Sequence, residues 1–264
     1  MGRWLIGACV VVLVQLTVSA SVADEFSTEW AASAKSQARL VAADKGLAGF
    51  EIRLAPGAIT YWRDPGDAGV PPAFDFSGSE NIVKVEPVFP SPERIAEADG
   101  TEAFGYEHDV VLPLRIKRAD PDKPATLDLR ASYAVCERIC LPARAHLKLS
   151  LPDAASHYAG VVEAALAASP RAVAPKDFGD LSQDGADAWR LCAPREGVNA
   201  RDLFVESPEG WRIAATPAAN NSGRDCFKLT LLEKPKGAEF PVALRLTMTG
   251  QQPVETTMEA GKPE

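Results

Sequence analysis

The sequence predicts an all-β protein, and three observations indicate this class. Short segments alternate apolar and polar residues with a period of two, which is typical of half-buried strands. Breaks rich in Gly and Pro, such as Asp64-Pro65-Gly66, separate these segments. Helical periodicity is nearly absent outside residues 153–169. The pattern predicts an antiparallel β-sandwich, followed by a helical linker and a second, smaller β-domain.

The composition narrows the class of protein further. The chain has 264 residues, a length that suits two domains of ordinary size. Its formal net charge of −8 argues against a nucleic-acid partner, because a nucleic-acid-binding face requires a basic balance. Only three His are present, which leaves little material for a histidine-based metalloenzyme. No phosphate loop or dinucleotide fingerprint stands out either, and we expect no cofactor.

The N-terminus has the features of a secretory signal peptide. Arg3 is the only charged residue before Asp24, an apolar run covers residues 5–14, and Ser21-Val22-Ala23 supplies the small residues that precede a cleavage site. The apolar run is shorter than the ~20 residues that a membrane span needs. We therefore expect export, cleavage near Ala23 and no membrane span in the mature chain.

The mature chain divides into three predicted segments. The first β-domain covers residues 24–152, a helix and linker follow at 153–175, and the second β-domain covers 176–264. Asp153 is expected to cap the helix and Pro170 to end it. The strand-like segments of the two domains are Phe50–Leu54, Leu112–Lys117, Leu127–Val135 and Leu147–Leu151, then Trp189–Cys192, Leu203–Glu206, Phe227–Leu232 and Val242–Thr247.

Four cysteines remain after the removal of Cys9, and an exported protein can hold them as two disulfides. Cys136 and Cys140 are too far apart on a regular strand or helix to form an unstrained disulfide, so the chain must bend between them. By its effect on the entropy of the unfolded chain, a disulfide that closes this short ring would stabilise the folded protein by only about 2 kcal/mol. The loop between Cys192 and Cys226 would give roughly 3.8 kcal/mol. We therefore predict a structural Cys192–Cys226 disulfide, whereas Cys136 and Cys140 fit both an exchanging pair and a hairpin staple.

Four segments of the first domain resemble a known family. They are Tyr133–Pro142 with its two cysteines, Thr60–Pro72, Phe76–Glu80 and Phe104–Tyr106. Together, and in their order along the chain, they are similar to the N-terminal domains of the thiol:disulfide interchange protein DsbD and its ScsB-like relatives. The resemblance covers about residues 35–151 and implies an immunoglobulin-like periplasmic domain.

The resemblance also implies a function and a site. Cys136 and Cys140 would be the exchanging pair of a thiol–disulfide oxidoreductase, Phe104 and Tyr106 would lie in a loop that caps them, and Tyr61 would lie nearby. Electrons would pass from a separate thioredoxin-like or membrane-embedded donor to periplasmic client proteins that carry disulfides. The cysteine spacing differs from that of the best-known members, and the motifs say nothing about residues 176–264.

Two other functions remain open at this point. Cys136 and Cys140 could bind copper(I), with His146 or His108 as a third ligand, although His146 is placed on the outward face of its strand. The chain could also be a structural, partner-binding protein in which both disulfides are staples. Resistance of the Cys136–Cys140 bond to mild reductant would favour that third function.

Overall fold

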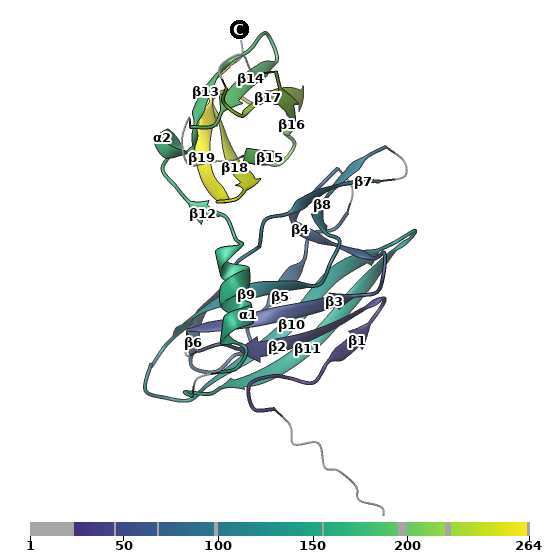
Figure 1. The fold of residues 1–264 in the computed structure, drawn as a ribbon, viewed down its shortest axis with the longest axis vertical. Helices are drawn as coiled ribbons and strands as arrows, with labels where there is room; N and C mark the ends of the chain where they lie inside the picture. Colours follow the sequence, from purple (N-terminus) through teal and green to yellow (C-terminus); the bar gives the residue numbers. More distant parts are fainter. Residues whose placement is uncertain are drawn as a thin grey trace, which may run out of the picture.

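The computed structural model describes residues 24–262, apart from positions 45, 68, 98–99, 155, 195–199 and 220–222. The predicted signal peptide, 1–23, lies outside the described residues. Two β-sandwiches are joined by one helix and a short connection, as Figure 1 shows. The prediction of an immunoglobulin-like β-sandwich, a helical linker and a second, smaller β-domain is confirmed.

The first sandwich consists of two antiparallel sheets. The strands of one sheet, in spatial order, are β1 (Ala31–Ser33), β2 (Ser36–Ala42), β3 (Leu47–Leu54), β9 (Val110–Arg118) and β6 (Ile82–Pro87). Those of the other are β11 (Cys140–Leu151), β10 (Ala125–Cys136), β4 (Ile59–Gly66), β8 (Glu102–Tyr106) and β7 (Glu93–Ala96), with β5 (Ala73–Asp75) paired to β10. The segments that were predicted as strands in this part of the chain all lie within strands.

Alternation along the strands builds the core between these sheets. On β10, Leu127, Leu129 and Tyr133 are buried with the core, whereas Arg130 and Ser132 are exposed. Strand β10 pairs with β11 along its whole length, from Ala125 opposite Leu151 to Cys136 opposite Cys140. The two cysteines therefore face each other across a tight turn, which is the bend that the sequence required.

Helix α1 (Ala159–Ala167) crosses the outer face of the five-stranded sheet (Figure 1). Its one fully buried side chain, Val162, packs against Val41 and Ala43. Asp153 does not cap this helix, which begins after Tyr158; its carboxylate instead forms an ion pair with Arg118 at 3.1 Å. The helix is too short to cross a membrane, and no other helix in the described part of the chain is long and apolar enough to do so.

The second sandwich has its own core and two four-stranded sheets. One sheet contains β12 (Arg171–Ala172), β19 (Val254–Ala260), β18 (Val242–Gly250) and β15 (Ala200–Glu206). The other contains β13 (Asp180–Gln183), β14 (Ala188–Cys192), β17 (Cys226–Glu233) and β16 (Arg212–Ala218). A single turn of helix, α2 (Pro175–Phe178), places the buried Phe178 under this core.

Candidate functional site

The Cys136–Cys140 disulfide lies at the tip of the β10–β11 hairpin. Its two Cα atoms are 4.1 Å apart, and Glu137, Arg138 and Ile139 form the turn between them. The two sulfur-bearing residues differ in exposure: Cys136 is 4% exposed, whereas Cys140 lies on the surface. An incoming thiolate can therefore reach the Cys140 side of the bond more easily than the Cys136 side.

A small apolar cluster surrounds Cys136 on the outer face of the six-stranded sheet. Its other members are Ile59, Tyr61, Ile95, Ala103 and Ala134. Residues that are paired across antiparallel strands point to the same face of a sheet. Because Cys136 is paired with Ile59, and Ala103 with Ile95, strands β4, β7 and β8 all contribute to this cluster.

Tyr61 contacts both sulfur atoms. Its hydroxyl group donates a hydrogen bond to Cys136 Sγ at 2.9 Å and lies 3.4 Å from Cys140 Sγ. Burial raises the pKa of Tyr61 above its usual value, and the negative charge of Glu97 raises it further. Tyr61 thus stays protonated at neutral pH and can donate a hydrogen bond to a thiolate on Cys136.

Gly69 covers the ring of Tyr61. Its φ of +118° suits glycine, and a Cβ atom built there would lie 2.3 Å from Cε1 of Tyr61. No side chain larger than hydrogen fits at this position without moving the ring or the loop. Gly69 therefore helps to fix Tyr61 against the disulfide, together with the buried residues Ile95 and Ala103.

The structure places Phe104 and Tyr106 away from the cysteines, in contrast to the expected cap. Side chains alternate along β8, so Ala103 points toward Cys136 while Phe104 and Tyr106 point to the opposite face. Phe104 packs edge-on against Phe204 of the second sandwich, with ring centroids 4.9 Å apart. The Tyr106 hydroxyl donates to the Pro90 carbonyl at 2.9 Å, and burial raises the pKa of Tyr106 well above its usual value.

Sequence reasoning missed several neighbours of the disulfide. Ile95 and Ala103 carry no chemical signal in the sequence and come to the site only through strand pairing. Lys35 forms an ion pair with Glu137 in the turn, from a position about a hundred residues earlier in the chain. Ile139 could have been recognised from the sequence as an exposed apolar residue, because a residue in a turn between two cysteines has no core to enter. Its side chain is 74% exposed.

The second disulfide, Cys192–Cys226, joins two strands inside the second sandwich. Cys192 on β14 lies opposite Cys226 on β17, and their Cα atoms are 4.1 Å apart. Cys226 is 6% exposed, and its neighbour Phe227 belongs to the core. The predicted pairing is present, and the bond ties together two strands that are far apart in sequence.

The histidines that were considered as metal ligands have other environments. His146 Nε2 lies 2.9 Å from a carboxylate oxygen of Asp128, and its side chain is largely exposed on β11. His108 lies in the turn between β8 and β9. Within the described residues, no group of three or more His, Cys, Asp or Glu side chains is arranged to hold a metal ion.

The family model for the N-terminal region of the thiol:disulfide interchange protein DsbD matches residues 23–152. These residues belong to the family of DsbD N-terminal domains. That segment contains both cysteines of the exposed disulfide, Tyr61 and every member of the cluster around Cys136. The DsbD-type domain and its disulfide are together consistent with a family of thiol–disulfide exchange proteins.

The fold has a solved counterpart that extends beyond the matched segment. The N-terminal periplasmic domain of ScsB from Proteus mirabilis superposes with a TM-score of 0.73 and 22% sequence identity, over 90% of this chain and 100% of that chain. The likeness therefore includes the second sandwich. A conserved domain protein from Bacillus anthracis aligns with a TM-score of only 0.23 and 10% identity, over 90% of this chain and 91% of that chain. Among curated proteins, none matches the chain in sequence.

Proposed function

We propose that this protein transfers electrons by thiol–disulfide exchange at Cys136 and Cys140. One observation carries the proposal: an exposed Cys140 is bonded to a buried Cys136 whose sulfur accepts a hydrogen bond from Tyr61. A staple needs no such asymmetry, whereas exchange needs one accessible sulfur and one stabilised leaving group. The DsbD-type family of this domain supports the same conclusion.

The reaction begins with the oxidised form. A thiolate of a dithiol donor attacks Cys140 Sγ, a bond forms between these two sulfurs, and the Cys136–Cys140 bond breaks. Cys136 leaves as a thiolate that accepts the hydrogen bond from Tyr61. The second thiolate of the donor then attacks its own partner sulfur in the mixed disulfide and releases Cys140, so that two electrons have moved to this protein.

The reduced protein passes these electrons to a client. Cys140 attacks a client disulfide, and Cys136 resolves the mixed disulfide, which restores the Cys136–Cys140 bond and leaves the client as a dithiol. We propose a separate thioredoxin-like or membrane-embedded protein as donor and periplasmic disulfide-bearing proteins as clients. The exposed side chain of Ile139, next to Cys140, supports docking of such partners by apolar contact.

Differential alkylation with mass spectrometry tests the proposal. The mature protein is equilibrated in a series of dithiothreitol and glutathione buffers, and each cysteine is scored as free or bonded. We expect Cys136–Cys140 to open at a mildly reducing poise while Cys192–Cys226 stays closed. Equal resistance of both bonds would contradict exchange and favour a structural role.

Two single variants separate the roles of the two sulfurs. With Cys136→Ser, Cys140 cannot be released by its partner cysteine, so mixed disulfides formed at Cys140 should accumulate when the reduced variant meets oxidised glutathione. With Cys140→Ser, the buried Cys136 should form them much more slowly. Equal trapping by both variants would contradict the assignment of Cys140 as the attacked sulfur.

A further inference from the structure

Strand β15 of the second sandwich has two different faces. Leu203 and Val205 point into the core of their own sandwich. The alternate residues Asp202, Phe204 and Glu206 contact the first sandwich, and we call these three the β15 docking face. Alternation along a strand explains why both faces are occupied.

Phe204 is the apolar centre of this face. It is 1% exposed and belongs to the core cluster of the first sandwich rather than to that of its own. Its ring packs edge-on against Trp62 at 5.8 Å and against Phe104 at 4.9 Å. The two sandwiches thus share one continuous apolar contact.

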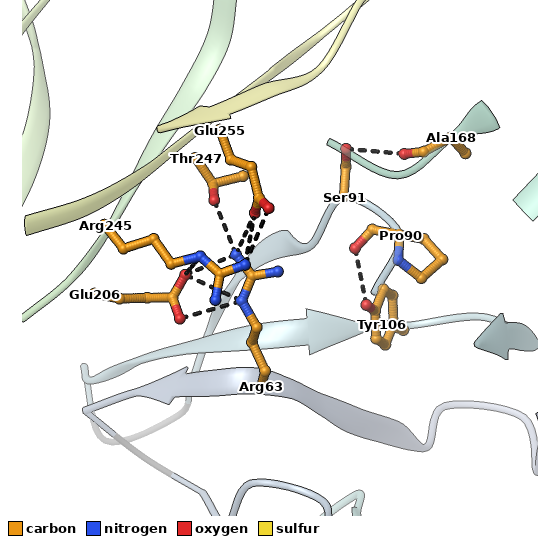
Figure 2. Close-up of polar contacts among 9 residues, drawn as sticks. All are labelled: Arg63, Pro90, Ser91, Tyr106, Ala168, Glu206, Arg245, Thr247 and Glu255. Carbon is orange, nitrogen blue, oxygen red and sulfur yellow. Dashed lines mark hydrogen bonds and ion pairs between the residues drawn. The ribbon is translucent and has the colours of Figure 1, made fainter. Parts of the chain in front are cut away.

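Charged residues flank Phe204 on both sides. Arg63 donates hydrogen bonds to Glu206 at 2.7 Å, to Glu255 at 2.8 Å and to the Thr247 hydroxyl at 3.2 Å, as Figure 2 shows. Burial by itself would lower the pKa of Arg63, but the hydrogen bonds and charges of Glu206 and Glu255 outweigh it and raise this pKa.

Arg94 makes the matching contact on the other side of Phe204. It binds the Asp202 carboxylate at 2.9 Å and the Leu203 carbonyl at 3.1 Å, and its guanidinium lies over the ring of Phe104. The partly buried Arg63 and Arg94 therefore fix the position of β15 on both sides of the apolar contact.

Three of the residues that contact the β15 docking face are chain neighbours of residues in the cluster around Cys136. Trp62 follows Tyr61, and on the other two strands the neighbouring pairs are Arg94 with Ile95 and Phe104 with Ala103. The register of β4 and β8 shifts after Tyr61, so that Trp62–Pro65 stand opposite Phe104 alone, and this bulge carries Trp62 and Arg63 toward β15. The same short strands hold the disulfide with one face and the second sandwich with the other.

We infer that the second sandwich is a positioning element of the redox site, in which the β15 docking face holds β4 and β8 so that Tyr61 stays hydrogen-bonded to Cys136. This inference rests on the proposed exchange at Cys136–Cys140. Within that exchange, the role of the second sandwich is to hold Tyr61 in position. Phe204 and Glu206 are positioning residues, since neither touches the reacting sulfurs.

The test measures reduction of Cys136–Cys140 by dithiothreitol in the full mature chain. Tyr61→Phe removes the hydrogen bond directly, and loss of such a bond should slow reduction about two- to tenfold. We expect Phe204→Ala to slow it by a similar factor, with Glu206→Gln as a milder variant should Phe204→Ala fail to fold. Phe240→Ala is the control, because Phe240 packs against Trp189 and Trp211 of its own sandwich.

The double variants distinguish positioning from general destabilisation. If β15 acts through Tyr61, then combining Phe204→Ala or Glu206→Gln with Tyr61→Phe slows reduction no further than Tyr61→Phe alone. Wild-type rates in both β15 variants, or effects that multiply with that of Tyr61→Phe, would overturn the inference and leave the proposed exchange intact.

A second readout does not depend on exchange activity. Backbone amides of β4 and β8 should exchange with deuterium faster in the β15 variants than in wild type or Phe240→Ala. If the wild-type disulfide resists dithiothreitol, the proposed function fails, and this measurement still decides the inference. Unchanged amide exchange in β4 and β8 would then overturn it.

Discussion

The hydroxyl group of Tyr61 contacts both sulfur atoms of the Cys136–Cys140 disulfide. It lies within hydrogen-bonding distance of Cys136 Sγ, the sulfur that would leave as a thiolate. Hydrogen bonds to charged groups are stronger than those to neutral ones, so this contact is worth more in the reduced protein than in the oxidised one. The strength of this hydrogen bond depends on the position of the Tyr61 ring, and Gly69 is one of the residues that restrict that position.

The variant Gly69→Ala tests this limit. The new methyl group would overlap the ring of Tyr61, so we expect the hydrogen bond to Cys136 to be lost and reduction by dithiothreitol to slow about two- to tenfold. Backbone strain should also cost about 1–2 kcal/mol, because φ at this position is positive. Stopped-flow reduction kinetics and urea unfolding measure the two effects.

Gly57→Ala is the matched control for Gly69→Ala. Gly57 also has a positive φ, of +76°, but no atom lies within 4 Å of the Cβ position. We expect a comparable loss of stability with unchanged reduction kinetics. Slower reduction in Gly57→Ala would show that strain alone, rather than contact with Tyr61, accounts for the kinetic effect.

At the scale of single elements, α1 joins the linker to the first sandwich through Val162. Val162→Ala removes two methyl groups from a fully buried contact with Val41 and Gly49, and should destabilise the protein by about 2–3 kcal/mol. Val161→Ala is the control: this side chain is 44% exposed, so the change should stay within about 0.5 kcal/mol. Equal effects in urea unfolding would contradict the role of Val162.

The pairing of strands β4 and β8 could not be predicted from the sequence. The alternation in segments such as Leu127–Val135 identified strands correctly, because one of their faces is buried and the other is solvated. Phe104 was expected near the cysteines, but the side of β8 on which it lies depends on its pairing with β4. That pairing contains a bulge, and a change of register by one residue moves every side chain to the opposite face.

The cysteine hairpin was more predictable than its surroundings. Bond geometry alone required a bend between Cys136 and Cys140, and the β10–β11 turn provides it. The residues that shield Cys136 come from β4, β7 and β8, which long-range pairing brings together. In β15, by contrast, Phe204 stands between Asp202 and Glu206 on one face of the strand, and an aromatic residue on a charged face is a signal of docking that the sequence does contain.

For the whole molecule, three buried tyrosines predict sensitivity to alkaline pH. Burial raises the pKa values of Tyr61, Tyr106 and Tyr133 in the folded protein. The unfolded chain therefore loses these protons first, at about pH 10. The stability that the three protonated tyrosines contribute is fully present below that pH. It is lost as the pH rises through the pKa values that these tyrosines have in the folded protein.

We expect Tm to fall steeply above about pH 10 and the fall to be shallower in Tyr106→Phe, which has no phenolic proton to lose. Scanning calorimetry from pH 8 to 12, with tyrosinate absorbance recorded in parallel, measures both effects. An identical slope in the variant would show that Tyr106 is not part of the alkaline transition.

The β10–β11 hairpin has a consequence for how partners recognise the protein. The two strands pair without interruption up to the cysteines themselves, so we expect the backbone hydrogen bonds of the hairpin to remain when the bond between the sulfurs opens. In the exchange proposed above, we therefore expect the reduced and the oxidised protein to have nearly the same outline. The proposed donor and client would then distinguish the two forms by the sulfur atoms, their charge and the side chains of the turn, which together belong to the five residues from Cys136 to Cys140.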